Sequence, residues 1–314
     1  MILNEKLYRI KRNIIHLYKK YFTLEGTYTC ILPDRIYLQM MHKQRFGKKM
    51  NLKKPKTFNE KLNWIKLYDR RSIYTVLVDK YKVRRYVADI VGEEYLIPLL
   101  GEWESPDDID FDILPNKFVL KCNHDNGVIV CKDKNQLDIP KVKDELRYRL
   151  SRDYSKKQRE WPYKNVPRKI ICEQYVSDSI HDSLVDYKFF CFDGCVKVVY
   201  VANSQQGELC IDFFDDHFNP LPIARLDHPN LPKDFCLSKP ENFEKMKQIA
   251  AKLSRDMPHA RIDLYNVSGK IYFGEVTVSP GGGFVPFDPE RWNYVLGNYI
   301  TLPKKHRRWS RYST

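Results

Sequence analysis

The chain has 314 residues, of which 43% are hydrophobic and 30% are charged, the balance of an ordinary soluble globular protein. This composition excludes a disordered chain, a collagen-like repeat and a coiled coil, and no run approaches the roughly 20 apolar residues of a membrane span. The formal net charge of +14 lies at the ends: residues 1–61 carry 15 Lys and Arg against four acids, residues 304–314 carry five against none, and residues 62–303 have a net charge of −2.

This charge distribution bears on the class of partner and on the compartment. A nucleic-acid-binding domain carries its basic surface on the folded body, so we expect no nucleic-acid partner. Basic ends fit peripheral contact with an anionic membrane surface at least as well. The eight cysteines are scattered, with no C-x-x-C pair, and are typical of buried thiols in a reducing compartment. Because the N-terminus lacks the apolar region of a signal peptide, we expect a cytoplasmic protein.

The first part of the chain is predicted to be helical. Residues 1–24 have apolar side chains at steps of three and four with basic residues between them, which indicates a helix that packs on its own protein or lies on an anionic bilayer. Residues 25–110 are expected to be mainly helical with short connections. Thr57 followed by Glu60 is a capping-box pattern that starts a helix, and a second helix over 79–91 is expected to end at Gly92.

From residue 117 the periodicity changes to that of strands. Strands are predicted over 117–122 and 128–132, around a polar turn at 123–127. A charged stretch of helix and loop follows over 141–159, and a helix is predicted over 240–254. Further strands are expected at 168–176, 186–192, 196–202 and 208–214, and a closing hairpin at 260–278. Helices followed by antiparallel strands with intervening helices indicate an α+β fold.

The closing hairpin holds a predicted metal site. A three-residue loop at 267–269 would place Arg261, Asp263, Glu275 and Thr277 on one face, with Asp263 and Glu275 as diagonal neighbours. A four-residue loop would put the two acids on opposite faces and remove the site. Two carboxylates on a rigid hairpin beside an arginine suit Mg²⁺ that holds a nucleotide phosphate. The alternative is a solvated face with surface ion pairs.

Three further features favour a phosphate site. Lys121 and Lys188 lie in the middle of predicted strands, where a charge is costly without a partner, although a lone strand lysine is more often snorkelling than catalytic. The segment that follows the acidic strand, Ser279-Pro-Gly-Gly-Gly283, is expected to offer exposed backbone N–H groups to an anion.

Together these features resemble a known family. Residues 55–303 are similar to the TupA-like branch of the ATP-grasp superfamily, found in bacterial capsule, O-antigen and teichuronopeptide gene clusters. The matching blocks are KPKTFNEKLNWIKLYDRR, DKYKVRRYV, GEEYLIPLLGEW, FVLKCNHDNG, DYKFFCFDG, ARIDLY, FGEVTVSPGGG and WNYVLGNYITLP. The resemblance implies the ATP-grasp fold, with lobe A at 111–172 and lobe B at 173–303 clasping ATP and Mg²⁺, followed by the basic tail 304–314.

The resemblance also implies roles for individual residues. At the nucleotide, Lys121 would contact the α- and β-phosphates, Lys188 would be the second phosphate lysine, and the loop 123–127 with His124, Asn126 and Gly127 would cover the phosphates; the hinge at the adenine would be Glu173, Gln174, Tyr175 and Val176. Magnesium would be held by Asp263 and Glu275, with Thr277, and Arg261 would face the γ-phosphate and the acyl phosphate. The residues at the substrate would be Ser279, Gly281, Gly282 and Gly283.

Two positions depart from the family pattern. Thr277 stands where many of these ligases have Asn, so a second metal ion would be held more weakly. The phosphate loop has one glycine, Gly127, and carries His124 and Asp125 instead. His124 either donates to a phosphate or is an exposed loop histidine without a role.

The implied reaction is ATP-dependent ligation of a carboxylate and an amine through an acyl phosphate. The expected partners are a small-molecule or glycan-linked carboxylate and an amine, with an amino acid or amino alcohol joined to a uronic acid of a surface polysaccharide. A glycosyltransferase is an alternative, but its D-x-D-type metal motif is approached only by Asp215-Asp216 and by Asp107-Asp108-Ile-Asp110 in polar loops. A kinase would use the same site, and a non-catalytic basic protein that binds a membrane surface would leave the hairpin acids idle.

Overall fold

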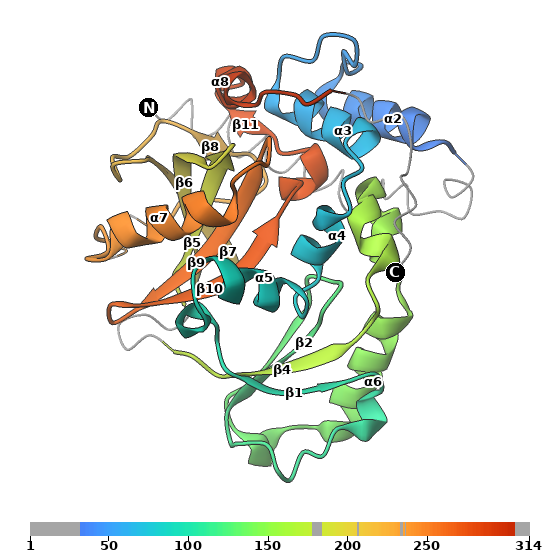
Figure 1. Cartoon of the computed structure of the whole chain (residues 1–314), viewed down its shortest axis with the longest axis vertical. Helices are drawn as coiled ribbons and strands as arrows, with labels where there is room; N and C mark the ends of the chain where they lie inside the picture. The colour runs from blue at the N-terminus through green and yellow to red at the C-terminus, as the bar shows by residue number, and fades with distance from the viewer. Residues whose placement is uncertain (1–31, 178–183, 206, 233–234, 236, 305–314) are drawn as a thin grey trace.

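The computed structural model describes residues 32–177, 184–205, 207–232, 235 and 237–304. The predicted helix at 1–24 and most of the basic tail 304–314 therefore lie outside the described residues. Two antiparallel sheets with their own helices make up most of the described structure (Figure 1). Among the described helices, none is both long and apolar enough to cross a membrane.

The larger sheet has five strands in the order β10-β9-β5-β6-β7, and every neighbouring pair is antiparallel. Its strands are β5 (Asp186–Phe192), β6 (Cys195–Gln205), β7 (Glu208–Asp215), β9 (Ala260–Val267) and β10 (Lys270–Thr277). Successive side chains alternate between the two faces, so Ile262 and Leu264 point to one core while Arg261 and Asp263 point to the opposite face.

Helices cover the two faces of this sheet with different chemistry. Helix α7 (Phe243–Leu253) packs Phe243, Met246, Ile249 and Leu253 onto one face, and their spacing of three and four gives it a single apolar side. The other face meets α3 (Phe58–Tyr68), together with α2 (Asp34–Phe46), α8 (Arg291–Tyr299) and the short sheet of β8 (Ala224–Arg225) and β11 (Phe287–Asp288). The second face therefore carries both a core and the side chains described below.

The smaller sheet has four strands in the order β1-β4-β2-β3. They are β1 (Leu99–Trp103), β2 (Phe118–Cys122), β3 (Val128–Cys131) and β4 (Ile170–Gln174), and α6 (Ile139–Ser151) packs Val142 and Leu146 against them. The short helices α4 (Ile73–Val78) and α5 (Val83–Ile90) lie between the two sheets (Figure 1).

Short 3₁₀-helices complete the described elements. They are η2 (Glu93–Tyr95), η3 (Pro106–Asp108), η4 (Lys134–Gln136), η5 (Tyr154–Arg159), η6 (Trp161–Asn165) and η7 (Pro280–Gly283). Of these, η5, η6 and η7 lie near α3 and α4 and help to shape the sites described below.

Most of the predicted elements are confirmed, with differences at three places. The capping box of Thr57 and Glu60 is complete at the start of α3. The second predicted helix begins later, at Val83, because the Asp79 carboxylate accepts from the backbone N–H groups of Tyr81 and Lys82 and ends α4 instead. Residues Leu99–Trp103 form a strand inside the region expected to be helical, since they pair with β4. Cys195 is exposed, whereas the other described cysteines are buried as expected.

Candidate active site

The turn between β9 and β10 differs from the predicted one. Ser268 and Gly269 both adopt left-handed backbone angles, with φ of 49° and 82°, and form a two-residue turn. Lys270 therefore pairs with Val267, and the predicted three-residue loop with Lys270 opposite Asn266 is wrong. A two-residue turn in unbroken register would set Asp263 opposite position 274 and would turn Glu275 to the other face.

A β-bulge at Gly274 restores the predicted face. The register shifts between Phe273 and Glu275, so that Glu275 lies directly opposite Asp263 rather than diagonal to it. A Cβ at position 274 would lie 3.1 Å from the Asp263 carbonyl oxygen, which favours glycine there. The prediction that the two carboxylates share one face is thus confirmed, although a different turn produces it.

Arg261 joins the two carboxylates. Its Nε and Nη2 donate to the two carboxylate oxygens of Asp263 at 2.7 and 2.6 Å, and Nη2 also donates to Glu275 Oε1 at 2.9 Å. Nη1 donates to the Tyr200 hydroxyl at 3.1 Å. Burial lowers the pKa of the Arg261 guanidinium, but the charges of Asp263, Tyr200 and Glu275, together with the hydrogen bond to Asp263, raise it well above the usual value. The group stays charged and holds both acids in place.

Lys188 approaches the same cluster from β5. Its Nζ donates to Asp263 Oδ2 at 2.6 Å and to the carboxylate of Asp186, two residues earlier on the same strand face. Burial lowers the pKa of Lys188, but the carboxylates of Asp186 and Asp263 raise it by more, so the ammonium form is retained. Burial raises the pKa of Asp186 to about 6, against the opposing charge of Lys188. The lysine predicted to need a partner in mid-strand therefore has two.

Glu275 is the most accessible acid of the cluster, with 35% of its side chain exposed. Thr277 Oγ1 donates to its Oε1 at 3.1 Å, and Lys80 Nζ lies 3.6 Å from its Oε2. Burial raises the pKa of Glu275, but the charges of the nearby cations have a larger effect in the opposite direction, with Lys80 contributing most. The pKa of Glu275 therefore lies below its usual range. The group is therefore a carboxylate at any physiological pH.

In the smaller sheet, Lys121 and Glu173 form a second charged group. Lys121 Nζ donates to Glu173 Oε2 at 2.6 Å, and Arg84 Nη1 from α5 donates to Oε1 of the same carboxylate at 3.1 Å. Lys121 and Glu173 lie on neighbouring strands β2 and β4. Glu173 is opposite Val119, two residues before Lys121, so the two side chains are diagonal neighbours on the same face. The structure thus brings together a predicted phosphate lysine and a predicted hinge glutamate.

The predicted phosphate loop is anchored more tightly than expected. Asn123, His124 and Asp125 are buried, and Asn126 is exposed. Gly127 N–H donates to Asp125 Oδ1 at 2.9 Å. Of the two alternatives for His124, the exposed loop histidine is therefore wrong, because the ring is buried in the turn, where burial lowers its pKa.

Lys80 links this loop to the hairpin. Its Nζ donates to the Asp125 carbonyl at 2.6 Å and pairs with Glu275, while its backbone N–H donates to the carbonyl of Asn123. The Asn123 side-chain amide donates to Asp79 at 2.9 Å. Residues 79 and 80 therefore fix the loop of the smaller sheet beside the acids of the larger one.

The rest of the predicted hinge lies at the end of β4. Gln174 is exposed, and its N–H donates to the carbonyl of Pro98 at 3.0 Å. Tyr175 and Val176 are half-buried, and Lys117 Nζ lies 6.0 Å from the Tyr175 ring centroid. The described chain stops at residue 177 and resumes at 184, just before β5, so these residues connect the two sheets.

The glycine-rich segment is largely enclosed. Ser279, Pro280, Gly282 and Gly283 are buried, and Gly281 alone among the five is exposed. Gly282 N–H donates to the Ser279 carbonyl at 2.8 Å, so the expectation that this segment offers a row of exposed N–H groups is wrong. The three glycines have φ of 54°, 61° and 76°, the left-handed region that only glycine adopts at little cost.

A polar stripe on α3 holds this segment. Asn59 exchanges hydrogen bonds with the backbone of Val285, and Asn63 Nδ2 donates to the Gly283 carbonyl at 2.8 Å. Lys66 Nζ donates to the Gly282 carbonyl at 2.6 Å. Positions 59, 63 and 66 are spaced by four and three, so one helix face provides all three contacts.

The hairpin acids have the chemistry that Mg²⁺ requires. Among the described residues, no group of three or more His, Cys, Asp and Glu side chains is arranged to hold a metal ion. Mg²⁺, however, binds through one or two carboxylates plus water and substrate phosphates, and Asp263 and Glu275 face each other with Glu275 partly open. In the described arrangement Arg261 and Lys188 occupy the Asp263 oxygens, so the residues fit Mg²⁺ when these cations turn to a phosphate.

Four side chains of this region were not predicted as site residues: Lys80, Arg84, Asp186 and Tyr200. For Asp186 a signal exists in the sequence, since it lies two positions before Lys188 on one strand and therefore shares its face. The other three come from elements far away in the chain, and their positions depend on the packing of α4, α5 and β6.

Comparison with known proteins identifies the family. A family model described as TupA-like ATPgrasp matches residues 60–301, about three quarters of the chain. Comparison with curated proteins finds no match.

Solved structures of ligases are more distantly similar. D-alanine–D-alanine ligase from Bacillus anthracis complexed with ATP has 17% identity and a TM-score of 0.40 over 72% of this chain and 65% of its own. L-amino acid ligase from Bacillus licheniformis has 14% identity and a TM-score of 0.43 over 72% of this chain and 49% of its own. N5-carboxyaminoimidazole synthetase from Staphylococcus aureus complexed with ADP has 10% identity and a TM-score of 0.39 over 65% of this chain and 45% of its own. In each case the matched segment is less than two thirds of the other protein's length.

Proposed function

Because this chain belongs to the TupA-like ATP-grasp family, we propose that it is an ATP-dependent ligase that joins a carboxylate to an amine. The observation that carries the proposal is the cluster of Arg261, Asp263, Glu275 and Lys188, which lies on the face of the larger sheet that is linked to the smaller sheet by Lys80. Such a cluster of fixed cations and carboxylates suits a bound nucleotide phosphate and its metal ion.

The reaction has two steps in this proposal. A substrate carboxylate oxygen attacks the γ-phosphorus of ATP, the bond between that phosphorus and the β,γ-bridging oxygen breaks, and ADP leaves. An amine nitrogen then attacks the acyl carbon, inorganic phosphate leaves with the bonding electron pair, and the amine loses a proton. Mg²⁺, when held by Asp263 and Glu275 with Thr277 beside it, supplies charge neutralisation at the phosphates.

The protein's own residues position the reactants and neutralise charge. Lys188 and Arg261 lie where they can shift from the Asp263 carboxylate to phosphate oxygens, since both are permanently charged in this site. Lys121, on β2 and hydrogen-bonded to Glu173 of β4, is the lysine for the α- and β-phosphates. Glu173 to Val176 form the adenine hinge, and the segment from Ser279 to Gly283 lines the substrate side.

The substrates follow from the family resemblance. We propose that the carboxylate belongs to a uronic acid of a surface polysaccharide or its precursor, and that the amine is an amino acid or an amino alcohol. The proposal includes a cytoplasmic location, with the basic residues at the two ends of the chain contacting an anionic membrane surface.

No described contact favours a glycosyltransferase. Asp215 accepts from the backbone N–H groups of His217 and Asn219, and so stabilises its own turn. Asp107 pairs with Arg147 on the surface. One carboxylate of each candidate motif thus has a structural partner.

Calorimetric titration of Mg²⁺-ATP into wild type and into Glu275→Gln tests the site. We expect wild type to bind and the variant to bind at least about tenfold more weakly, since a charged partner of the metal and of Arg261 is lost. Glu241→Gln, an exposed acid near α7, is the matched control and should bind like wild type. Absence of binding to well-folded wild type would contradict the proposal.

A second assay separates ligase from kinase. Incubation with ATP, a uronic acid and an amino acid should release ADP and phosphate and form an amide that mass spectrometry detects. A stable phosphorylated substrate that does not react with amines would indicate a kinase, and amide formation without ATP consumption would rule out the proposed mechanism.

A further inference from the structure

A second pocket lies away from the acids of the hairpin. It has a volume of about 290 Å³ and is formed by the start of α2, the connection between α3 and α4, and the helices η5 and η6. None of the residues implicated in the proposed ATP site lines it. Its size is at the lower end of small-molecule pockets.

The pocket has an excess of positive charge. Four cationic side chains line it, those of Arg70, Lys156, Arg159 and Lys164, against the two carboxylates of Asp34 and Asp153. The lining therefore has a net charge of +2, which a phosphate monoester or a diphosphate would neutralise and a single carboxylate would not.

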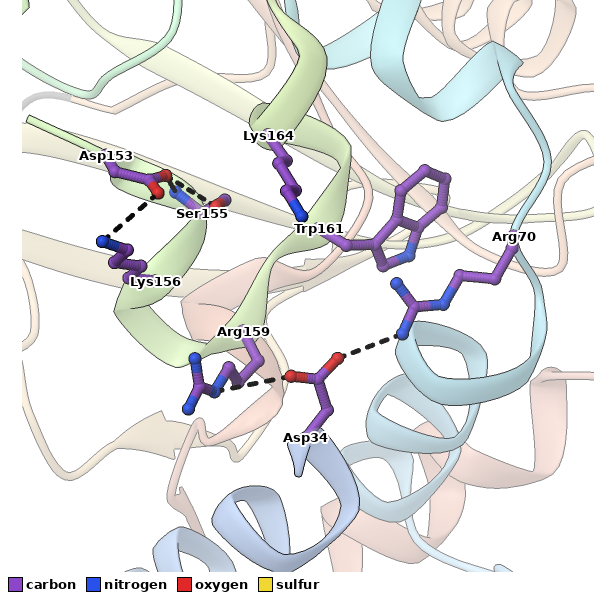
Figure 2. Close-up of a pocket in the computed structure, with 8 residues that line it drawn as sticks. All are labelled: Asp34, Arg70, Asp153, Ser155, Lys156, Arg159, Trp161 and Lys164. Atoms are coloured by element: carbon purple, nitrogen blue, oxygen red, sulfur yellow. Dashed lines mark hydrogen bonds and ion pairs between the residues drawn. The ribbon is translucent and has the colours of Figure 1, made fainter. Parts of the chain in front are cut away.

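The two arginines are held in place by one carboxylate. Asp34 lies between them, with Arg70 Nη2 at 3.2 Å and Arg159 Nε at 3.5 Å (Figure 2). Arg70 also lies over the Trp161 ring at 5.2 Å, and Arg159 lies over the Tyr37 ring at 4.5 Å. Because the guanidiniums are fixed before a ligand arrives, they lose little conformational freedom when an anion binds.

The two lysines that line the pocket are held less firmly by neighbouring side chains than the two arginines are. Lys156 Nζ lies 3.8 Å from Asp153, whose carboxylate also accepts a hydrogen bond from the Ser155 hydroxyl at 2.6 Å. Lys164 has no ion pair among the described side chains, and its ammonium group points into the same pocket beside Trp161 (Figure 2). Both lysines can therefore turn to a bound anion at little cost.

The pocket and the proposed substrate segment share a stretch of backbone. Gln158 and Arg159 both adopt left-handed angles, with φ of 56° and 55°, which is costly for residues other than glycine. This conformation directs Arg159 into the pocket, while the Gln158 carbonyl accepts from Lys66 and the Gln158 side chain lies against Gly282. One strained segment thus separates the pocket from the glycine-rich segment.

Helix α4 contacts both η6 and β10, which places the same segment near the hairpin. Tyr154 and Tyr163 pack edge to face with ring centroids 4.8 Å apart, and burial followed by the charges of Glu160 and Glu275 raises the pKa of both phenols. The helices η5 and η6 therefore lie close to both the pocket and Glu275.

We propose that this pocket binds the phosphate or diphosphate group of the acceptor substrate, at a site separate from the site for ATP. Assigning the anion to the acceptor rests on the proposed function, whereas binding of the anion itself does not. The shared chemistry is a sugar-linked diphosphate, which a nucleotide sugar and a lipid-linked sugar both carry.

The test is calorimetric titration of inorganic pyrophosphate into protein saturated with a non-hydrolysable ATP analogue, so that the nucleotide site is filled. We expect wild type to bind, and the double variant Lys156→Glu with Lys164→Glu to bind at least about tenfold more weakly. Lys252→Glu, an exposed lysine on α7, makes the same kind of charge change elsewhere and should stay within about twofold.

Affinity for the ATP analogue is measured in the same variants and should be unchanged. If circular dichroism shows that the double variant does not fold, Lys156→Gln with Lys164→Gln replaces it. Equal pyrophosphate affinity in wild type and the folded pocket variant, or no binding to wild type, would overturn the inference.

Two further titrations identify the source of the diphosphate. Tighter binding of UDP-glucuronic acid than of farnesyl diphosphate would indicate a nucleotide sugar, and the reverse order would indicate a lipid carrier. Failure of the ADP-release assay together with intact, pocket-dependent pyrophosphate binding would count against the ligase but not against the pocket. ADP release that is insensitive to the pocket variants would leave the ligase standing and reject the acceptor assignment.

Discussion

At the scale of single residues, the cations decide the character of both sites. Arg261 is buried and Lys188 largely so, but both remain charged because carboxylates contact them directly. Lys66 is buried and has no carboxylate contact among the described residues: its ammonium group donates to the carbonyls of Gln158 and Gly282, and burial lowers its pKa to about 7. The pKa of Lys66 is thus lowered, whereas the pKa values of Arg261 and Lys188 are raised, although all three cations lie largely out of solvent.

The lowered pKa of Lys66 predicts a pH-dependent contribution to stability. Between pH 7 and the usual lysine pKa the unfolded chain binds a proton that the folded chain does not, so the free energy of unfolding increases with pH over this range. Relative to Lys66→Met, we expect the wild-type unfolding free energy to rise by about 2 kcal/mol from pH 7 to pH 9. Urea unfolding of both proteins at several pH values measures this difference.

Lys43→Met, at an exposed position on α2, controls for the loss of one positive charge. Parallel pH profiles for wild type and Lys66→Met would show that Lys66 is protonated in the folded protein throughout this range.

At the scale of elements, α3 serves as a clamp. Its capping box fixes where the helix starts, and its apolar residues Phe58, Leu62 and Ile65 anchor it on the larger sheet. The polar stripe beside them, described above, binds the backbone of the segment from Gly282 to Val285. A glycine-rich segment loses more conformational entropy on ordering than other sequences, so these hydrogen bonds decide whether it keeps one conformation.

Substitution of Asn63 tests this clamp. Asn63→Ala removes the side-chain amide that donates to the carbonyls of Asn59 and Gly283 and leaves the buried Gly283 carbonyl without this donor, and we expect it to lower the free energy of unfolding by about 1–3 kcal/mol. Asn298→Ala, at an exposed helical position on α8, should cost less than about 0.5 kcal/mol. Urea unfolding curves of the two variants make the comparison, and equal losses would mean that the stripe does not hold the segment.

At the scale of the whole molecule, the two sheets are joined by contacts from the start of α5 and the segment before it. Arg84 pairs with Glu173 of the smaller sheet, and Lys80 contacts both the loop at Asp125 and the carboxylate of Glu275. The segment thus sets the distance between the groups that are proposed to bind the two ends of the ATP phosphate chain.

Lys80→Met tests this link. The variant loses a cation that contacts both sheets, and we expect Mg²⁺-ATP to bind about tenfold more weakly, because a charged hydrogen bond and a nearby positive charge are removed. Lys82→Met, two residues later and exposed, changes the same charge without either contact and should bind like wild type. Calorimetry on the two variants would contradict the proposed role of Lys80 if their affinities were equal.

Much of the fold follows from local sequence patterns. Alternation along β9 and β10, combined with a three-residue loop, predicts that Arg261, Asp263 and Glu275 share a face, and the capping box of α3 and the apolar spacing of α7 are visible without a structure. The register of the hairpin is a different matter: the two-residue turn and the bulge at Gly274 compensate for each other. Both arrangements place Glu275 on the same face as Asp263, so the alternation of side chains along the strands cannot distinguish a two-residue turn with a bulge from a three-residue loop.

The sequence by itself determined the family, the α+β class and the identity of the charged residues at the hairpin, because these depend on neighbours along the chain. Tertiary structure alone decided the burial of His124, the enclosure of the glycine-rich segment, the positions of Lys80 and Arg84, and the basic pocket. These features join residues from distant parts of the chain, such as Asn59 with Val285 and Asp34 with Arg159. Packing of helices onto the sheets brings such residues together, and no periodicity along the chain records it.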